Sequence, residues 1–155
     1  MQGAIENKLK SMNIELPQPV TPVANYVPYV ITGHLVFISG QLPVKDGKPQ
    51  HIGKAGKEFT IEQAQASARL CGINLLSQLR AACGGNLDRV KKCVRLGIFV
   101  NSAAGFTDQP KVANGVSDLM VELFGEAGKH ARAAVGVNEL PFGVAVEVDG
   151  VFEIT

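Results

Sequence analysis

The fold is decided by the stretch ARAAVGVNELPFGVAVEVDGVFEI, which occupies residues 131–154. Valine recurs along it, at positions 135, 137, 144, 146, 148 and 151. Branched side chains pack well on a pleated sheet and lose rotamers in a helix, so the stretch predicts two β-strands. Residues 140–143 (LPFG) separate these strands, and we interpret the pair as a hairpin.

Two charged side chains in this stretch are candidates for function. Glu147 lies in the middle of the more apolar strand, where an unpaired carboxylate would cost roughly several kcal/mol, so it needs a partner or a water-filled pocket. Arg132 has small alanines beside it, and its guanidinium fork matches a carboxylate in two parallel hydrogen bonds. A register that pairs Glu139 with Val144 would place both on one sheet face. The alternatives are a solvated arginine at a strand end and a structural ion pair from Glu147 to Arg132 or to a lysine.

Composition and charge describe an ordinary globular domain. The 155 residues fall within the usual range of about 50–250 per domain, 46% are hydrophobic and the formal net charge is +1. This balance argues against a nucleic-acid binder, which carries a basic face. No apolar run approaches the roughly 18–20 residues that span a bilayer, and the first 13 residues lack the apolar core of a signal peptide. We therefore expect a cytoplasmic protein that contacts neither nucleic acid nor membrane.

The region before the domain predicts a helix and an extended connector. Residues 2–12 place Ile5, Leu9 and Met12 on one helical face, and residues 14–22 contain three prolines. We assign residues 1–22 to this N-terminal helix and connector, and residues 23–155 to a single domain.

Within the domain, the pattern of elements predicts an α+β fold. Strand-like runs at 25–31 and 35–38 precede a polar loop at 45–57. A capping box of Thr60 and Gln63 begins a helix that ends at Gly84 and Gly85. A strand over 90–100, a second helix over 111–124 and the two closing strands complete the order β-β-α-β-α-β-β. We expect one mixed sheet with two helices on one face, and an apolar opposite face that favours oligomerisation.

Spacing excludes the common catalytic and metal-binding motifs. The sequence contains no H-E-x-x-H and no G-x-S-x-G, and its cysteines show neither C-x-x-C spacing nor nearby histidines. We interpret the cysteines as reduced packing residues and the histidines as surface residues, and expect no metal and no cofactor. These residues are Cys71, Cys83, Cys93, His34, His51 and His130.

Several segments in order resemble the RidA family, also called YjgF-like or L-PSP endoribonuclease-like proteins. The resemblance covers roughly residues 25–154. It implies a chorismate-mutase-like α+β fold that forms homotrimers with clefts between subunits, and an activity that hydrolyses reactive enamines and imines, such as 2-aminoacrylate, to 2-keto acids and ammonia without a cofactor. The segments are YVPYV (26–30), ISGQLPV (38–44), GGNLDRV (84–90), ARA (131–133), LP (140–141) and VEV (146–148).

The resemblance also implies roles for individual residues. Arg132 resembles the family's carboxylate-binding arginine, and Glu147 the acid that positions the attacking water. The pocket residues that it implies are Tyr26, Ser39, Gly40 and, with a one-residue offset before Arg132, Asn114. The family's deaminases often place a cysteine two residues beyond the arginine, where this chain has Ala134. The N-terminal extension and the longer loop at 45–57 indicate a divergent branch.

Three functions remain open on the sequence. The first is enamine or imine deamination, which is motivated by Arg132 and Glu147. The second is non-catalytic binding of small carboxylates or keto acids at the same clefts, motivated by Ala134 in place of the cysteine. The third is ribonuclease activity, which rests on the family's older name, and the near-neutral charge argues against it.

Overall fold

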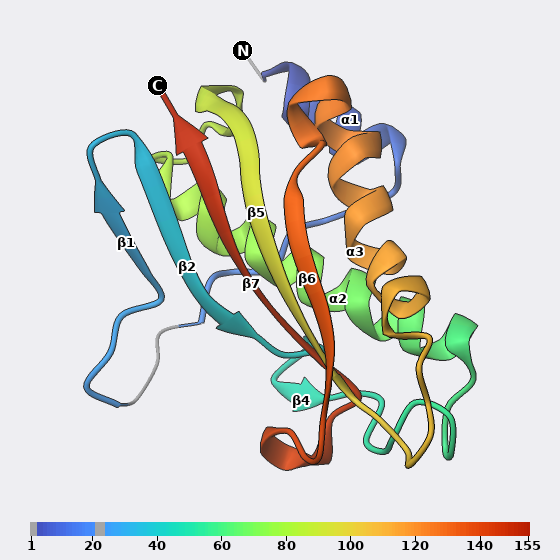
Figure 1. The fold of residues 1–155 in the computed structure, drawn as a ribbon. Helices are drawn as coiled ribbons and strands as arrows, with labels where there is room; N and C mark the ends of the chain where they lie inside the picture. Colours follow the sequence, from blue (N-terminus) through green and yellow to red (C-terminus); the bar gives the residue numbers. More distant parts are fainter. Residues whose placement is uncertain (1–2, 21–23) are drawn as a thin grey trace.

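A computed structural model describes residues 3–20 and 24–155. A five-stranded sheet forms one layer, and the two long helices pack together on one of its faces (Figure 1). The helices are α1 (Ala4–Ser11), α2 (Ile61–Ala82) and α3 (Gln109–Phe124). The strands of the main sheet are β1 (Tyr29–Thr32), β2 (Leu35–Gln41), β5 (Val90–Asn101), β6 (Ala131–Val137) and β7 (Val146–Ile154), and β3 (Val44–Lys45) pairs separately with β4 (Lys48–Pro49).

The predicted α+β fold is confirmed. The main sheet has the order β1-β2-β7-β5-β6, in which β5 and β6 are parallel and the other neighbours antiparallel. Burial alternates along β7, so that Val148 and Phe152 face the helices while Glu147 and Val151 are half-buried on the opposite side. We call these two sides the helix-covered face and the open face. Among the described residues, no helix is long and apolar enough to cross a membrane.

The predicted hairpin over residues 131–154 is wrong. β6 and β7 do not pair with each other, because each pairs with β5, which lies between them (Figure 1). The connection through α3 delivers β6 parallel to β5 on one edge, and residues 138–145 then carry the chain to the other edge. Both strands were recognised from their valines, but local sequence does not encode which neighbour a strand chooses.

The core lies between the sheet and α2 with α3. α2 begins with the predicted capping box: the backbone N–H of Gln63 donates to Thr60 Oγ1 at 3.2 Å, and the Thr60 N–H donates to Gln63 Oε1 at 2.8 Å. The three cysteines are reduced and buried, as the packing interpretation predicted. Burial also raises the pKa of each of their thiols.

The polar loop expected over residues 45–57 is partly ordered into a hairpin. Val44 pairs with Pro49 and Lys45 with Lys48, around a two-residue turn of Asp46 and Gly47 that both have positive φ. An Asp-Gly pair favours this kind of turn, so the signal was present in the sequence. The hairpin was overlooked because its strands are only two residues long.

The N-terminal segment is fastened to the C-terminal half of α2. The Ser77 hydroxyl donates to the Pro17 carbonyl at 2.6 Å, and the Gln78 side-chain amide donates to the Val20 carbonyl at 2.9 Å. Leu9 and Leu16 are buried in the core. The boundary predicted between residues 22 and 23 falls within residues 21–23, which lie outside the described part of the chain.

The close packing of α2 on α3 gives a test of the fold. A Cβ added to Gly115 in α3 would overlap the backbone carbonyl of Gln65 in α2, and backbone yields little. We expect Gly115→Ala to lower the free energy of unfolding by about 1–3 kcal/mol despite the better helix propensity of alanine. Urea denaturation measures this, and Asp118→Ala, at an exposed position of the same helix, should change it by less than about 0.5 kcal/mol. An unchanged or higher stability of Gly115→Ala would contradict this packing.

Candidate functional site

Arg132 lies on the edge strand β6, beneath α3. It is aligned with Leu96 of β5, whose side chain is buried, so Arg132 belongs to the helix-covered face. Its Nη1 donates to Asn114 Oδ1 at 2.9 Å and to Ser117 Oγ at 3.0 Å, and its Nη2 donates to the Pro110 carbonyl at 3.3 Å. A guanidinium has five N–H donors, so these bonds leave Nε–H and one Nη2–H. The exposed arginine is thus held in place and retains two donors for a carboxylate.

The sequence did not indicate the chain of hydrogen bonds that runs from His130 through Ser117 to Arg132. His130 Nδ1 lies 2.6 Å from the Gly128 carbonyl, and Nε2 lies 2.9 Å from Ser117 Oγ. A carbonyl only accepts, so Nδ1 carries a proton, and in the neutral ring Nε2 accepts from the Ser117 hydroxyl. The serine oxygen then keeps its lone pairs for Arg132. Far from being a plain surface residue, His130 is partly buried and orders the side chains around the arginine.

Glu147 lies on the open face, opposite Phe99 of β5. A Cβ on Gly40 would overlap Glu147 Oε2, so the carboxylate lies directly over this glycine, where a larger residue would displace it. Burial, followed by the negative charge of Asp149, raises the pKa of the Glu147 carboxyl above its ordinary value. Glu147 is half-buried rather than fully buried, and no ion pair from it to Arg132 or to a lysine occurs among the described residues.

Ser39 and Tyr26 lie next to Gly40, where the pairing of β2 with β7 shifts register between Ile38 and Gln41. The Ser39 hydroxyl donates to the Val27 carbonyl at 2.8 Å, and the Ser39 N–H donates to the Pro28 carbonyl at 2.9 Å. These bonds hold the segment that carries Tyr26, whose side chain is exposed. Tyr26, Ser39 and Gly40 all line one cavity of about 510 Å³.

The candidate residues therefore form two separate groups. The arginine half-site consists of Arg132, Asn114 and Ala134, which follows Arg132 by two residues on the same face of β6. The glutamate half-site consists of Glu147 with Gly40, Ser39 and Tyr26. The expectation that Arg132 and Glu147 share a sheet face is wrong, because it assumed that β6 pairs with β7. With β5 between them, the two side chains lie on opposite faces of strands about 10 Å apart.

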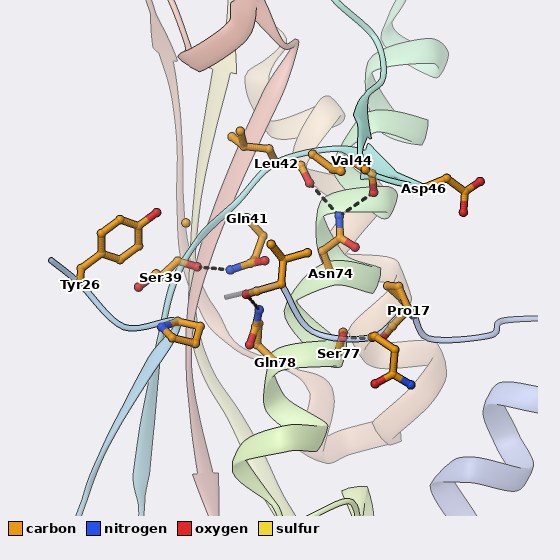
Figure 2. Close-up of a pocket in the computed structure, with 15 residues that line it drawn as sticks. Pro17, Tyr26, Ser39, Gln41, Leu42, Val44, Asp46, Asn74, Ser77 and Gln78 are labelled. Atoms are coloured by element: carbon orange, nitrogen blue, oxygen red, sulfur yellow. Dashed lines mark hydrogen bonds between the residues drawn. The ribbon is translucent and has the colours of Figure 1, made fainter. Parts of the chain in front are cut away.

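The cavity at the glutamate half-site extends toward the N-terminal connector. Figure 2 shows its walls: the end of β2, the loop that leads into β3, the C-terminal half of α2, and the connector at Pro17. Asn74 of α2 donates its amide hydrogens to the carbonyls of Leu42 and Val44, at 2.8 and 3.0 Å. This wall has no signature in the sequence, since polar residues along a helix ordinarily indicate only its solvated side.

Metal chemistry has no evident location among the residues that the structure describes. No group of three or more His, Cys, Asp or Glu side chains there is arranged to hold a metal ion. The chemistry that the two half-sites offer is that of a carboxylate-binding arginine and of a carboxylate whose raised pKa favours the uptake of a proton.

Comparisons with known proteins show the family of this chain. Residues 6–148 match the family model described as "YjgF/chorismate mutase-like, putative endoribonuclease". Protein TCP17 of Trypanosoma cruzi is 48% identical over 153 residues, which cover 98% of this chain and 95% of that protein. The crystal structure of Atu1372, a protein with unknown function from Agrobacterium tumefaciens, is 42% identical with a TM-score of 0.92, over 97% of this chain and 92% of the other.

A second structural relative is RidA from an Antarctic Psychrobacter. It is 26% identical with a TM-score of 0.59, over 88% of this chain and 94% of RidA. The match to the family model includes every candidate residue of both half-sites, from Tyr26 to Glu147. The order of strands, the long match and the relatives lead to one conclusion: the chain belongs to the YjgF/chorismate mutase-like family, which includes the RidA proteins.

Proposed function

We propose that this protein hydrolyses reactive enamine and imine intermediates of the 2-aminoacrylate type to 2-keto acids and ammonia, in clefts between the subunits of a homotrimer. The observation that carries the proposal is the division of the candidate residues into two half-sites on opposite faces of one sheet. Each half-site offers what the other lacks: one has an anchor for a carboxylate, and the other a carboxylate that can hold water. Membership of the family and the likeness to RidA support the reaction class.

The open face supports assembly. It carries two groups of exposed or half-buried apolar side chains, one across β1, β2 and β7 and one across β5 and β6, with Arg95 and Glu147 between them. Apolar side chains are stabilised by removal from water at about 25 cal/mol per Å². The glutamate half-site lies on this face, and the arginine half-site lies at the β6 edge. Contact between the open face of one subunit and the β6 edge of the next would complete a cleft. The apolar residues are Val30, Phe37, Phe99, Val135 and Val151.

In such a cleft the chemistry follows from the two half-sites. Arg132 binds the substrate carboxylate through its two remaining donors, and an enamine first tautomerises to the iminium. Glu147 of the partner subunit holds a water and accepts a proton from it as the water oxygen attacks the iminium carbon. The proton then passes from Glu147 to the nitrogen. The C–N bond breaks as the C=O bond forms, the hydroxyl proton returns to Glu147, and ammonia and the 2-keto acid leave. Positioning of the water next to the carbon supplies most of the acceleration.

With Ala134 at the position of the family's cysteine, the site has no thiol, but every step of the proposed reaction can still occur. The arginine supplies the anchor and the carboxylate supplies the base, so neither depends on a cysteine. If the cleft binds keto acids without turnover, the protein is a binder of small carboxylates. An RNA-cleaving activity has less support, because a net charge of +1 provides little attraction for a phosphate backbone.

Loss of the anchoring arginine tests the reaction. We expect the purified protein to accelerate keto-acid release from imines produced by an amino-acid oxidase, and Arg132→Ala to lower kcat/KM about 100-fold or more, since two charge-assisted hydrogen bonds are lost. Arg132→Lys, which keeps the charge without the fork, should be intermediate. Arg69→Ala, at a partly exposed ion pair on α2, is the control and should leave turnover unchanged. No acceleration over the spontaneous reaction, with any precursor, would refute the deaminase proposal.

Subunit mixing tests whether the half-sites come from different chains. Arg132→Ala and Glu147→Gln should each be inactive alone. When they are unfolded and refolded together at a 1:1 ratio, about a quarter of the clefts receive both native residues, so about a quarter of the wild-type activity should return. Sedimentation of the mixture should show trimers. If the mixture stays inactive although each variant assembles, both residues must come from one chain, and the inter-subunit cleft is wrong.

The charge of Asp149 gives a pH test. Asp149 raises the pKa of the Glu147 carboxyl, and activity requires the ionised form, so turnover should rise with pH through that pKa. Asp149→Asn removes the negative charge and should shift the acid limb of the kcat/KM profile to lower pH. Asp118→Asn makes the same change of charge at an exposed site on α3 and should leave the limb in place. If the acid limb of the profile does not shift in Asp149→Asn, Glu147 is not the group whose ionisation limits the reaction.

A further inference from the structure

The hydrogen bonds behind Arg132 run in one direction only. At one end a guanidinium nitrogen of Arg132 can only donate, and at the other end the Gly128 carbonyl can only accept. Between them lie Ser117 Oγ, 3.0 Å from Arg132 Nη1, and His130 Nε2, 2.9 Å from that oxygen. His130 Nδ1 lies 2.6 Å from the Gly128 carbonyl, so it carries the proton of the neutral ring. The Ser117 hydroxyl therefore donates to Nε2, and its oxygen accepts from Arg132.

The partners of Arg132 all belong to one face of α3. Pro110, Asn114 and Ser117 are spaced by four and three residues, which places them in one row along the helix, and α3 lies beside β6 (Figure 1). A free arginine side chain has about 2 kcal/mol of rotamer entropy to lose. Because Arg132 is already held, it loses less of this freedom when a ligand binds.

This bonding decides how a carboxylate can reach the arginine. Both hydrogens of Nη1 are used, on Asn114 Oδ1 and Ser117 Oγ, and one of the two hydrogens of Nη2 is used on the Pro110 carbonyl. A carboxylate that took two parallel hydrogen bonds end-on would need a hydrogen from Nη1. The remaining donors are on Nε and Nη2, so two parallel bonds can form only side-on, along that edge of the guanidinium.

From this arrangement we infer that Ser117 and His130 are positioning residues, which make Arg132 bind a carboxylate side-on through Nε and Nη2. Resting on the proposed function, the inference assigns them a part in turnover. Loss of either residue weakens the hold on Nη1 and lets the substrate carboxylate bind end-on or through a single bond. The charge of Arg132 remains, so binding changes little, but the reacting carbon is displaced from the water that Glu147 of the partner subunit would hold. A displacement of about 1 Å can lower a rate about 100-fold.

A split between kcat and KM tests the positioning role. We expect His130→Leu and Ser117→Ala each to lower kcat for keto-acid release from imines about tenfold or more, and to raise KM less than about threefold, because the charge of Arg132 persists. Ser117→Thr keeps the hydroxyl, and His130→Gln keeps an acceptor and a donor in its amide. Both conservative variants should therefore retain more of the wild-type kcat than their apolar counterparts.

His34→Leu is the matched control for the loss of an imidazole. His34 is exposed in the turn between β1 and β2, and its replacement should change neither constant. Unchanged kcat in His130→Leu and Ser117→Ala, or an effect on KM as large as that on kcat, would overturn the inference. If neither conservative variant exceeds its apolar counterpart, the hydrogen bonds are not responsible and the inference fails as well.

The ring of His130 gives a readout that does not depend on turnover. Nitrogen-15 NMR distinguishes the neutral imidazole protonated at Nδ1 from the one protonated at Nε2 and from the doubly protonated ring. We expect His130, identified by the loss of its signals in His130→Gln, to be protonated at Nδ1 alone under the assay conditions. Protonation at Nε2 alone, or at both nitrogens, would reverse the bond to Ser117 and overturn the inference.

Pyruvate binding separates this inference from the proposed function. The Nε–H proton signal of Arg132, identified by its absence in Arg132→Lys, should move downfield when pyruvate is added to the wild-type protein, because the carboxylate accepts from this group. The shift should be lost or much reduced in Ser117→Ala. If that result holds but no imine is turned over, deamination is refuted and the inference stands. If imines are turned over but the signal does not move, or moves equally in Ser117→Ala, deamination stands and the inference is overturned. Neither turnover nor pyruvate binding would refute both.

Discussion

The arrangement of this protein depends on one strand that is paired along both edges. β5 runs 12 residues, with β6 parallel on one side and β7 antiparallel on the other. Because side chains alternate across a sheet, the register on each edge fixes which face every candidate residue occupies. Arg132 aligns with Leu96 and falls on the helix-covered face, whereas Glu147 aligns with Phe99 and falls on the open face. The two residues are therefore separated within one chain, as the inter-subunit cleft proposed above would have them.

Each half-site is held by contacts that reach beyond its own strand. Arg132 receives its orientation from α3 through Asn114 and Ser117, and His130 orders the serine in turn. Glu147 obtains its position from the absence of a side chain at Gly40, on the neighbouring strand β2. The guanidinium is therefore restrained by the acceptors to which it donates. The carboxylate is restrained by shape and by the cost of burying its charge. This difference suits an anchor on one side and a proton acceptor with a raised pKa on the other.

The N-terminal segment contributes to the interior and to the site region together. Leu9 and Leu16 are buried in the core, while the carbonyls of Pro17 and Val20 are bonded to α2 and form a wall of the cavity. A segment rich in proline can be held in this way because its carbonyls remain free to accept while its backbone adds few donors that need partners. The extension thus forms a wall of the cavity next to Ser39 and Gly40.

The sequence by itself determined the elements and their chemistry. Valine-rich runs gave the strands, the capping box at Thr60 gave the start of α2, and the isolated charges drew attention to Arg132 and Glu147, because these signals are local and one residue type or spacing carries each. Only the tertiary structure decided the partners of β6 and β7, the opposite faces of the two charges, the hydrogen bonds of His130 and the cavity beside the connector. Those features depend on contacts between residues far apart in the chain, and strand register and hydrogen-bond direction are not encoded in any short stretch.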